Sequence, residues 1–583
     1  MRWILPKVDE ASAAMLVRDL GLHPVAARVL VARGLATAEA AKELFQDSLT
    51  DLPDPSRMKG IEEAVTRLVR ALRSSEKITL YGDYDVDGVT SSAILATFLR
   101  AVGATDVATY TPLRLDEGYG LNAEAVERIA RDGTRLLVSL DCGITSVAEL
   151  EVARKLGLDA IVVDHHQLGP TLPPAVAVID PHQPGCTFPS KDPCTAGLAF
   201  LLVVALRRAL REAGHFGSTR AEPNLREYLD LVALGTIADV VPLRGINRIL
   251  VKHGLTEIAR SRRPGIRALT AVAGLTGTPT AGQVAFRLAP RINAAGRLAD
   301  AKAGVELLTT TDAARAESLA KALDAANTER QAIEKRILEE ALIQAETFRD
   351  ARSLVLSAQG WHPGVIGIVA ARVVERFHRP TFVVALHGEE GKGSGRSVEG
   401  FHLHQALTRC AEHLIRYGGH KHAAGLSLKA RALPAFREAL ETEARASLGD
   451  GPMEGRCRID ALVGPNEIDQ RLIEALERLA PFGAGNPEPV LASLGLSAQP
   501  RVLTSKSGGA GHLKLTLAAA RHLDVIGFHL ADKAALLGAG LFDAAFQVGL
   551  DEYQGVPRIS LKLKDVRPGQ EGVEAKRAKA EAV

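Results

Sequence analysis

Strand-like and helix-like segments alternate between residues 61 and 166, and this alternation limits the fold more than any other feature of the chain. Apolar, β-branched runs occur at 77–81, 135–143 and 160–166, and amphipathic stretches such as 147–157 lie between them. Strands that alternate with helices along a chain form parallel sheets covered by helices. The sequence therefore predicts an α/β fold with a doubly wound parallel sheet, in which ligands bind at the carboxyl ends of the strands.

Acidic and imidazole side chains stand at these strand ends. The segment GDYDVDG follows the first strand, LDCG ends the second, VVDHH ends the third, and the apolar segment LVALGTIADVVPL carries one more acid. The side chains concerned are Asp83, Asp85, Asp87, Asp141, Asp164, His165, His166 and Asp239. A single Asp at a strand end is most often a helix cap, and a single acid in an apolar segment is most often structural. Each stretch alone is therefore a weak indication of a site.

The combination of these stretches is harder to explain by helix capping. Several carboxylates would meet at one edge of one sheet, where they would repel each other and raise each other's pKa. Divalent cations remove this conflict, and mixed oxygen and imidazole ligands without thiolates suit Mn²⁺ or Mg²⁺. The pattern predicts two such ions, which together activate a water molecule and hold a phosphoryl group.

Charge balance and cysteine content restrict the class of protein. The chain has 71 Lys and Arg residues against 69 Asp and Glu residues. Binding of a polyanion therefore requires positive charge gathered in one groove. The 5 cysteines are scattered, which indicates a reducing cytoplasm and not a disulfide framework. The longest apolar run, 196–206, is too short to span a bilayer, and the first residues show no signal-peptide pattern. We expect a cytoplasmic protein with no membrane partner.

The remainder of the chain changes character several times. Residues 301–350 are rich in Ala, Glu, Leu, Arg and Lys, which indicates one or two long helices. A second α/β unit follows, and short alternating segments near the C-terminus indicate a small antiparallel barrel. The expected divisions are a lead-in at 1–60, a catalytic domain at 61–300, a connecting long helix at 301–350, a substrate-binding domain at 351–452, a barrel at 453–567 and a disordered tail at 568–583.

The motifs also resemble those of a known enzyme family. DYDVDG, LDCG, DHH and GTIADVVPL resemble the four motifs of the DHH phosphoesterase superfamily. YTPLRLDEGYGLN, RLAPRINAAGRL, GWHPGVIGIVAAR, SGRSVEGFHL and YGGHKHAAGL, in that order, resemble the bacterial RecJ family of single-strand-specific 5′→3′ DNA exonucleases. The resemblance runs from about residue 50 to 567. It implies a DHH domain, a DHH-associated domain, a C-terminal OB-fold and two-metal hydrolysis of phosphodiester bonds from the 5′ end of single-stranded DNA.

The resemblance implies a role for each strand-end residue. Two Mn²⁺ or Mg²⁺ ions would be held, directly or through an oriented ligand, by Asp83, Asp85, Asp87, Asp141, His165, His166 and Asp239. Which of the three acids in the first motif contacts which ion stays open. Asp164 is expected to orient His165 from behind or, alternatively, to cap a helix.

The later motifs imply residues that bind the 5′ end of the substrate. Ser394, Arg396 and Arg114 are expected to hold the terminal phosphates, since a guanidinium binds phosphate bidentately. The glycine-rich segment with Gly418 and Gly419 allows the backbone to approach a phosphate closely.

His420 is expected to stabilise charge on the scissile phosphate, with a structural role in a tight turn as the alternative. The path of the strand, between the DHH domain and the second α/β domain, is expected to be lined by Arg291, Asn293 and Arg297. An ordinary interdomain salt bridge is the alternative for Arg297. Such a channel would admit one strand and exclude a duplex by its width.

The family resemblance also implies partners. They are single-stranded DNA, single-strand-binding protein and a RecQ-type helicase, with roles in DNA repair and recombination. OB-folds bind single strands with basic residues and stacking rings. Candidates in the barrel, each of which is alternatively an ordinary surface or core residue, are Lys506, Lys514, Lys562, Lys564, Phe528 and Tyr553.

One segment departs from the family pattern. Pro193, Cys194 and Thr195 stand where the resemblance leads us to expect small apolar residues and glycine. We expect this difference to affect local packing and not the metal ions. Two alternatives to the exonuclease stay open: a DHH enzyme that acts on dinucleotides, cyclic dinucleotides or pyrophosphate, and a degenerate DHH protein that binds single-stranded DNA without cleaving it.

Overall fold

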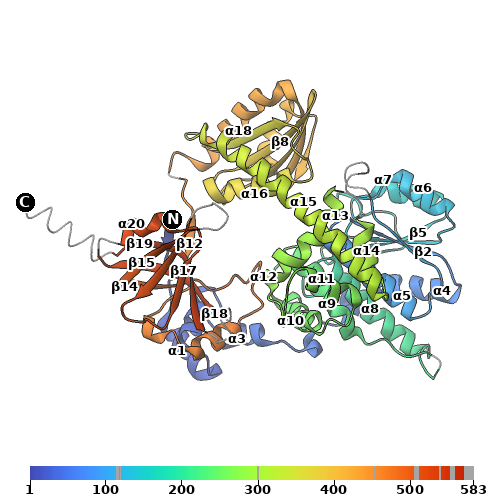
Figure 1. Ribbon diagram of the computed structural model, residues 1–583. Helices are drawn as coiled ribbons and strands as arrows, with labels where there is room; N and C mark the ends of the chain where they lie inside the picture. Colours follow the sequence, from blue (N-terminus) through green and yellow to red (C-terminus); the bar gives the residue numbers. More distant parts are fainter. Residues whose placement is uncertain are drawn as a thin grey trace, which may run out of the picture. The chain divides into compact units, whose positions relative to one another are not determined.

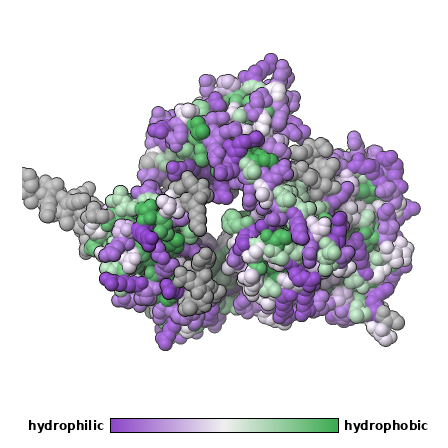
Figure 2. Space-filling view, in the orientation of Figure 1, coloured by the Kyte–Doolittle hydropathy of each residue, from purple (hydrophilic) through white to green (hydrophobic). Residues whose placement is uncertain are grey.

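The structure is a computed structural model that describes residues 1–112, 117, 120–218, 220–298, 301–451, 453–504, 511–537, 540–551 and 558–569. The chain forms two compact units (Figure 1). One unit contains residues 1–52, residues 242–249 and the chain from residue 455 onward. The other contains residues 53–241 and 250–454. Hydrophilic residues predominate on the face shown in Figure 2, and hydrophobic residues form small separate patches there.

A five-stranded parallel sheet forms the first part of the larger unit. Its strand order is β3 (Val107–Tyr110), β2 (Ile78–Gly82), β4 (Leu136–Leu140), β5 (Asp159–Val163) and β6 (Ala177–Ile179). Every residue of β2 and β4 is buried, as expected for strands covered by helices on both faces. All four strand pairs are parallel, which confirms the predicted sheet.

Helices cover both faces of this sheet. On one face, α6 (Ala123–Arg131) and α7 (Val147–Lys155) pack over a core that contains Leu137 and Val162. The other face carries α4 (Ile61–Arg73), α5 (Val86–Ala101) and α8 (Thr195–Glu212), and α8 packs against both α4 and α5. The almost wholly apolar α9 (Leu229–Ala238) packs against α5 and is buried nearly throughout. Helix α5 begins just after the carboxyl end of β2. The start of α8 and the end of α9 contact residues at the same edge of the sheet.

A helical region follows the sheet. Its elements are α10 (Gly245–Arg260), α11 (Pro264–Val272), α12 (Ala281–Gln283), a π-helical turn (Val284–Leu288), α13 (Ala289–Leu298), α14 (Lys302–Thr309) and α15 (Ala313–Glu346). The 34-residue α15 is the long helix predicted from composition, and its N-terminus is capped by Asp312. It packs against α11, α13 and α16 (Ile366–Phe377).

A second sheet has helices on both faces. Its order is β10 (Arg416–Gly419), β11 (Ala423–Lys429), β9 (Glu390–Arg396), β8 (Thr381–His387) and β7 (Leu354–Gln359). Only the pair of β7 and β8 is parallel. Helix α16 packs on one core with the end of α15, and α17 (Leu403–Arg409) and α18 (Leu433–Leu448) pack on another. The predicted second α/β domain is therefore present.

The smaller unit contains a seven-stranded sheet. Its order is β13 (Ala461–Leu462), β14 (Leu491–Leu496), β18 (Phe542–Asp551), β19 (Arg558–Pro568), β17 (Asp524–Gly527), β16 (His512–Leu517) and β15 (Ala498–Leu503). Pairing is antiparallel, as predicted for the barrel, except that β13 with β14 and β17 with β19 are parallel.

The N-terminal residues contribute to the core of this smaller unit. Helices α1 (Glu10–Leu20), α2 (Pro24–Ala32) and α3 (Ala38–Phe45) pack into the same hydrophobic core as the sheet. Arg33, which follows α2, binds Asp460 through two hydrogen bonds of 3.0 and 3.1 Å. The structure thus adds helices to the segment expected as a lead-in. Among the described residues, no helix combines the length and apolar composition that a bilayer crossing requires.

Candidate metal centre and substrate site

The acids of the first motif are placed by the turn from β2 into α5. Asp83 directly follows β2, Asp85 caps α5, and Asp87 lies in the first turn of that helix. Asp85 Oδ1 accepts hydrogen bonds from the backbone N–H groups of Asp87 (2.8 Å) and Gly88 (3.2 Å). The capping role that is common for a lone Asp therefore applies to Asp85, and only its Oδ1 takes part in these two capping bonds.

The other candidate ligands come from three further elements. Asp141 follows β4 and adopts a φ of 65°, in the left-handed region that Asp tolerates better than most residues. His165 and His166 follow β5, and Asp239 ends α9. The parallel register of the sheet brings the ends of β2, β4 and β5 to one edge, as the sequence predicted.

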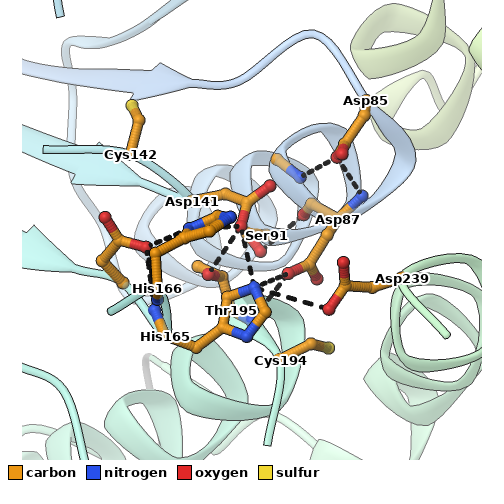
Figure 3. Close-up of polar contacts among 12 residues, drawn as sticks. Asp85, Asp87, Ser91, Asp141, Cys142, His165, His166, Cys194, Thr195 and Asp239 are labelled. Atoms are coloured by element: carbon orange, nitrogen blue, oxygen red, sulfur yellow. Dashed lines mark hydrogen bonds and ion pairs between the residues drawn. The ribbon is translucent and has the colours of Figure 1, made fainter. Parts of the chain in front are cut away.

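The side chains converge closely. His165 Nε2 lies 3.4 Å from Asp141 Oδ1, 3.4 Å from Asp239 Oδ2 and 3.9 Å from Asp87 Oδ2 (Figure 3). Three groups of ligand atoms, each with all members within 4.8 Å of one another, can hold an ion: Asp141 with His165 and His166, Asp87 with His165 and Asp239, and Asp83 with Asp85 and Asp141. Asp141 and His165 each belong to two of the groups, so the groups form one connected centre.

Burial makes this cluster of acids unfavourable without a positive charge. Asp87 and Asp141 are almost fully buried. Burial, together with the neighbouring Asp87, raises the pKa of Asp141 well above its usual value and raises the pKa of Asp239 to about 9. Burial likewise raises the pKa of Asp87 and lowers that of His165. The centre therefore favours bound cations, which allow the carboxylates to ionise.

The residues fit divalent ions by three criteria. Asp239 Oδ2 and His165 Nε2 are buried and have no hydrogen-bond partner within the part of the chain that the structure describes. Such atoms are costly to leave unsatisfied, and a metal ion satisfies both. Octahedral ligands at about 2.1 Å from an ion lie about 3 Å apart when adjacent and about 4.2 Å apart when opposite, which brackets the observed spacings. The nearby Cys194 thiol stays protonated because burial raises its pKa well above the usual value, so the donors are oxygen and imidazole.

Asp164 holds the histidine pair from behind. Its Oδ1 accepts hydrogen bonds from the backbone N–H of His165 (2.8 Å) and His166 (3.2 Å) and lies 2.7 Å from His166 Nδ1. Its Oδ2 accepts a hydrogen bond from the backbone N–H of Ile144, just beyond Asp141. The expectation that Asp164 orients the His165 ring differs from this arrangement, because the ring that it contacts is that of His166. Burial opposes charge on His166, but the bond to Asp164 outweighs it and raises the pKa of His166 to about 9.

The side chains of Ser394 and Arg396 lie beside the first turn of α16. Both are on β9, and Arg396 donates hydrogen bonds to Gly395 O (2.8 Å) and Ser394 Oγ (3.4 Å). A Cβ on Gly367 would lie 2.9 Å from Ser394 Oγ and 3.3 Å from Arg396 Nη2, so glycine allows this close approach. Helix α16 has no side-chain cap and no acid in its first turn. A guanidinium, a hydroxyl and a helix N-terminus together suit a phosphate.

His420 occupies a tight turn after β10. Its backbone N–H donates to Ala423 O (2.8 Å), and its Nδ1 accepts a hydrogen bond from His422 N. Gly419 has a φ of 133°, and a Cβ there would meet Ala423 O at 2.5 Å, so the turn requires glycine. Gly418 is exposed beside it. Partial burial lowers the pKa of His420, with smaller effects from the charges of Arg396 and His166.

A cleft of about 560 Å³ lies among α13, α15, α16 and the π-helical turn. Asn293 and Arg297 line it, and Arg297 also donates a 2.9 Å hydrogen bond to Gly364 O. Arg291 has a different place: it pairs with Asp324 at 2.8 Å and is not among the residues that line the cleft. Further lining residues are Phe286, Arg330, Lys335 and Arg372. Phe286 is 78% exposed, more than any other large apolar residue that the structure describes.

Comparison with known proteins identifies a family. Residues 77–236 match the DHH family N-terminal domain, residues 350–446 the DHHA1 domain and residues 459–565 the RecJ OB domain. The single-stranded-DNA-specific exonuclease RecJ of Escherichia coli (strain K12) is 36% identical over 94% of this chain and 96% of its own length. The corresponding RecJ of Thermus thermophilus is 40% identical over 90% of this chain and 73% of its own length. The chain belongs to the RecJ family.

Solved RecJ structures share the fold. RecJ from Thermus thermophilus in complex with Mn²⁺ matches 97% of this chain and 79% of its own, with a TM-score of 0.82 and 35% identity. The Mg²⁺ complex of the same RecJ gives a TM-score of 0.76 and 34% identity. The OB-fold, the DHH-associated domain and the family expected from the sequence are confirmed by these matches.

Some of the residues predicted to contact DNA lie outside the part of the chain that the structure describes. Two features of the site were not predicted from the sequence. Arg114, Lys506, Tyr553 and the tail from residue 570 onward lie outside the part that the structure describes. The exposed Phe286 and the contact of Thr195 with Asp141 were not predicted. Phe286 lies in the motif FRLAPRINAAGRL, so its position was visible in the sequence, but its exposure was not. The contact of Thr195 joins residues 54 positions apart, and no local pattern indicates it.

Proposed function

We propose that this protein is a metal-dependent exonuclease that removes nucleotides from the 5′ end of single-stranded DNA. The observation that carries this proposal is the buried centre, in which Asp141 and His165 link three ligand groups because each belongs to two of them. Membership of the RecJ family supports the substrate, and the place of Ser394 and Arg396 at the start of α16 supports recognition of a phosphorylated end.

The side chains of the centre would hold two Mn²⁺ or Mg²⁺ ions. Asp141 is the best candidate to contact both, because it belongs to two ligand groups. Asp83 and Asp85 complete one of these two groups, and His165 and His166 complete the other. Asp87 and Asp239 form a third group with His165. When bound, such ions supply Lewis-acid stabilisation of the phosphoryl group and lower the pKa of water. Asp164 holds the ring of His166 through Nδ1, so this ligand keeps one orientation beside the ions.

The second α/β domain would position the 5′ end. Arg396 and Ser394 bind the terminal phosphate, with help from the N-terminus of α16. His420 donates a hydrogen bond to a non-bridging oxygen of the scissile phosphate. Asn293 and Arg297 contact the strand where it follows the cleft. A site that holds a phosphorylated end at a fixed place beside the metal centre cleaves progressively from that end.

Digestion of a long single-stranded DNA, labelled at either end, tests the proposal directly. Reactions contain Mn²⁺, Mg²⁺ or EDTA, with a duplex of the same sequence beside them. We expect nucleotide release from the 5′ end only, on the single strand only, and none with EDTA. Binding without cleavage in either metal would overturn the proposal in favour of a degenerate binder. Cleavage of dinucleotides but not of the long strand would overturn the substrate and keep the superfamily.

Lys335→Ala in the cleft should weaken single-stranded DNA binding without changing the metal centre. Each lysine contact to a phosphate contributes about 0.7 to the slope of log affinity against log salt for a single strand. We therefore expect the slope to fall by about that amount, measured by fluorescence anisotropy over a salt series. Lys321→Ala is the matched control, since Lys321 is also exposed on α15 but does not line the cleft. Equal slopes for both variants and the unmodified protein would place the strand elsewhere.

We also propose that the protein acts in the cytoplasm, in DNA repair and recombination, with single-strand-binding protein and a RecQ-type helicase as partners. Family membership supports this proposal. The measurement is digestion of a duplex with purified helicase and ATP added, where we expect degradation to begin only when the helicase supplies a free 5′ strand. The contribution of single-strand-binding protein is measured by adding it to the same reaction and comparing the rates of DNA degradation.

A further inference from the structure

The start of α8 contacts the metal centre directly. Residues 193–195 were expected to influence local packing only, but Thr195 is fully buried and its Oγ1 donates a 3.1 Å hydrogen bond to Asp141 Oδ1 (Figure 3). Thr195 is the first residue of α8, on a different element from any of the candidate ligands. The side chain that departs from the family pattern is therefore in contact with an acid of the centre.

The same helix start also binds a second acid. Thr195 N donates to Asp87 Oδ2 at 2.7 Å, and Ala196 N donates to Asp87 Oδ1 at 2.8 Å. Cys194, the residue before the helix, provides no side-chain cap. Asp87, which belongs to α5, therefore caps the N-terminus of α8. Each of its two carboxylate oxygens accepts one of these hydrogen bonds. The 18-residue α8 also presents the positive end of its dipole to these carboxylates.

The hydrogen bond from Thr195 fixes one particular oxygen. Asp141 Oδ1 is also the atom that lies 3.4 Å from His165 Nε2 and 4.0 Å from His166 Nδ1. The left-handed backbone of Asp141 sets the direction of its side chain, and the hydroxyl limits rotation of the carboxylate about its last bond. A donor in this place leaves the other lone pairs of the carboxylate to point toward the ions.

We infer that Thr195 is a positioning residue for Asp141, and that its buried hydroxyl increases the affinity of the centre for divalent ions. This inference rests on the proposed function, in which Asp141 is a metal ligand. A hydroxyl behind a ligand is worth about 10- to 100-fold in metal affinity in other sites. A purely structural role for Thr195, as the first residue of a helix, would change thermal stability but not metal affinity.

The test compares Thr195→Val with Thr195→Ser. Valine keeps the shape of threonine without the donor, and serine keeps the donor. Binding of Mn²⁺ to protein stripped with EDTA is followed by the electron paramagnetic resonance signal of the free ion. We expect about tenfold weaker Mn²⁺ binding for Thr195→Val and near-normal binding for Thr195→Ser. The Mn²⁺ concentration for half-maximal cleavage should rise in parallel, while the rate at saturating Mn²⁺ stays close to normal.

Thr134→Val is the matched control. Thr134 is also buried, and its hydroxyl hydrogen-bonds to Thr79 at 2.8 Å before the start of β4, at the opposite end of that strand from Asp141. This variant should lose some thermal stability and keep its Mn²⁺ affinity. Unchanged Mn²⁺ affinity in Thr195→Val, with two ions still bound by the unmodified protein, would overturn the inference alone. If the unmodified protein binds no Mn²⁺, the inference and the proposed function both fail.

Discussion

Replacing Asp141 by asparagine should abolish cleavage of single-stranded DNA and leave DNA binding near its normal level. Asp141 belongs to two of the three ligand groups, so loss of its charge weakens both ion positions at once. Loss of a group that only supports a ligand costs about 10- to 100-fold in activity or affinity, and loss of a shared ligand should cost more. The cleavage rate and the number of Mn²⁺ ions bound per chain are the measurements, and we expect the number to fall below two.

The metal-free form of this variant gives an independent measurement. Burial and the neighbouring acids raise the pKa of Asp141, which means that its charged form is disfavoured in the folded protein. Asparagine removes that repulsion, so metal-free Asp141→Asn should unfold at a temperature at least as high as the metal-free unmodified protein. Added Mn²⁺ should stabilise the unmodified protein much more than the variant, because a ligand stabilises only the state that binds it.

Asp180→Asn separates the loss of a ligand from the loss of any buried acid. Asp180 follows the neighbouring strand β6, is fully buried and lies 3.0 Å from His182 Nδ1, but it belongs to none of the ligand groups found among the described residues. This control should keep cleavage and Mn²⁺ stoichiometry. If Asp141→Asn retains both as well, the ions are held elsewhere and the assignment of the centre is wrong.

The sequence was most informative where a property depends on local pattern and on the direction of strands. The acids after β2 and β4 and the histidines after β5 could be brought together in advance, because parallel strands end at one edge. Asp239 could not be placed by strand direction, because it ends the buried helix α9. Only the apolar residues around it in the sequence indicated that this acid has a partner.

Contacts between distant side chains could not be predicted in the same way. Arg291 lies in a motif rich in candidate DNA contacts, but its partner Asp324 is 33 positions away on another helix. Thr195 meets Asp141 because α8 packs against α5 and the strand β5, and nothing in PCTAG indicates that contact. Helices α1–α3 have weak individual patterns and acquire their place from a core supplied more than 400 positions later. In each case the missing information was the tertiary packing.

The charge distribution agrees with the expectation for a nearly neutral chain. Positive side chains gather along the cleft, where Arg297, Arg330, Lys335 and Arg372 lie together with one acid, Glu334. Glu334 pairs with Arg330 at 2.6 Å, so part of that charge is already compensated. The cleft lining therefore carries more positive than negative side chains, as the proposed path of the DNA requires.

Replacing Arg396 by alanine should reduce cleavage of DNA that carries a 5′ phosphate and have little effect on DNA that ends in a 5′ hydroxyl. The half-buried guanidinium lies beside Ser394 Oγ and the start of α16, where we propose that the terminal phosphate binds. A charge-assisted hydrogen bond contributes about 1.5–3 kcal/mol, which corresponds to about 10- to 100-fold in rate at low substrate concentration. Initial rates on a matched pair of oligonucleotides, with and without the 5′ phosphate, give the comparison.

Arg376→Ala is the control for general loss of charge, since Arg376 is exposed in the last turn of α16, at the opposite end of that helix from Arg396. It should leave both rates unchanged. An Arg396→Lys variant should recover only part of the preference, because an ammonium keeps the charge without the planar fork of two donors. Equal losses on both substrates in Arg396→Ala would mean that the guanidinium acts on the scissile phosphate or supports the fold of β9. A loss confined to the phosphorylated end would instead place the terminal phosphate at this helix start, and the polarity of the enzyme would follow from that one contact.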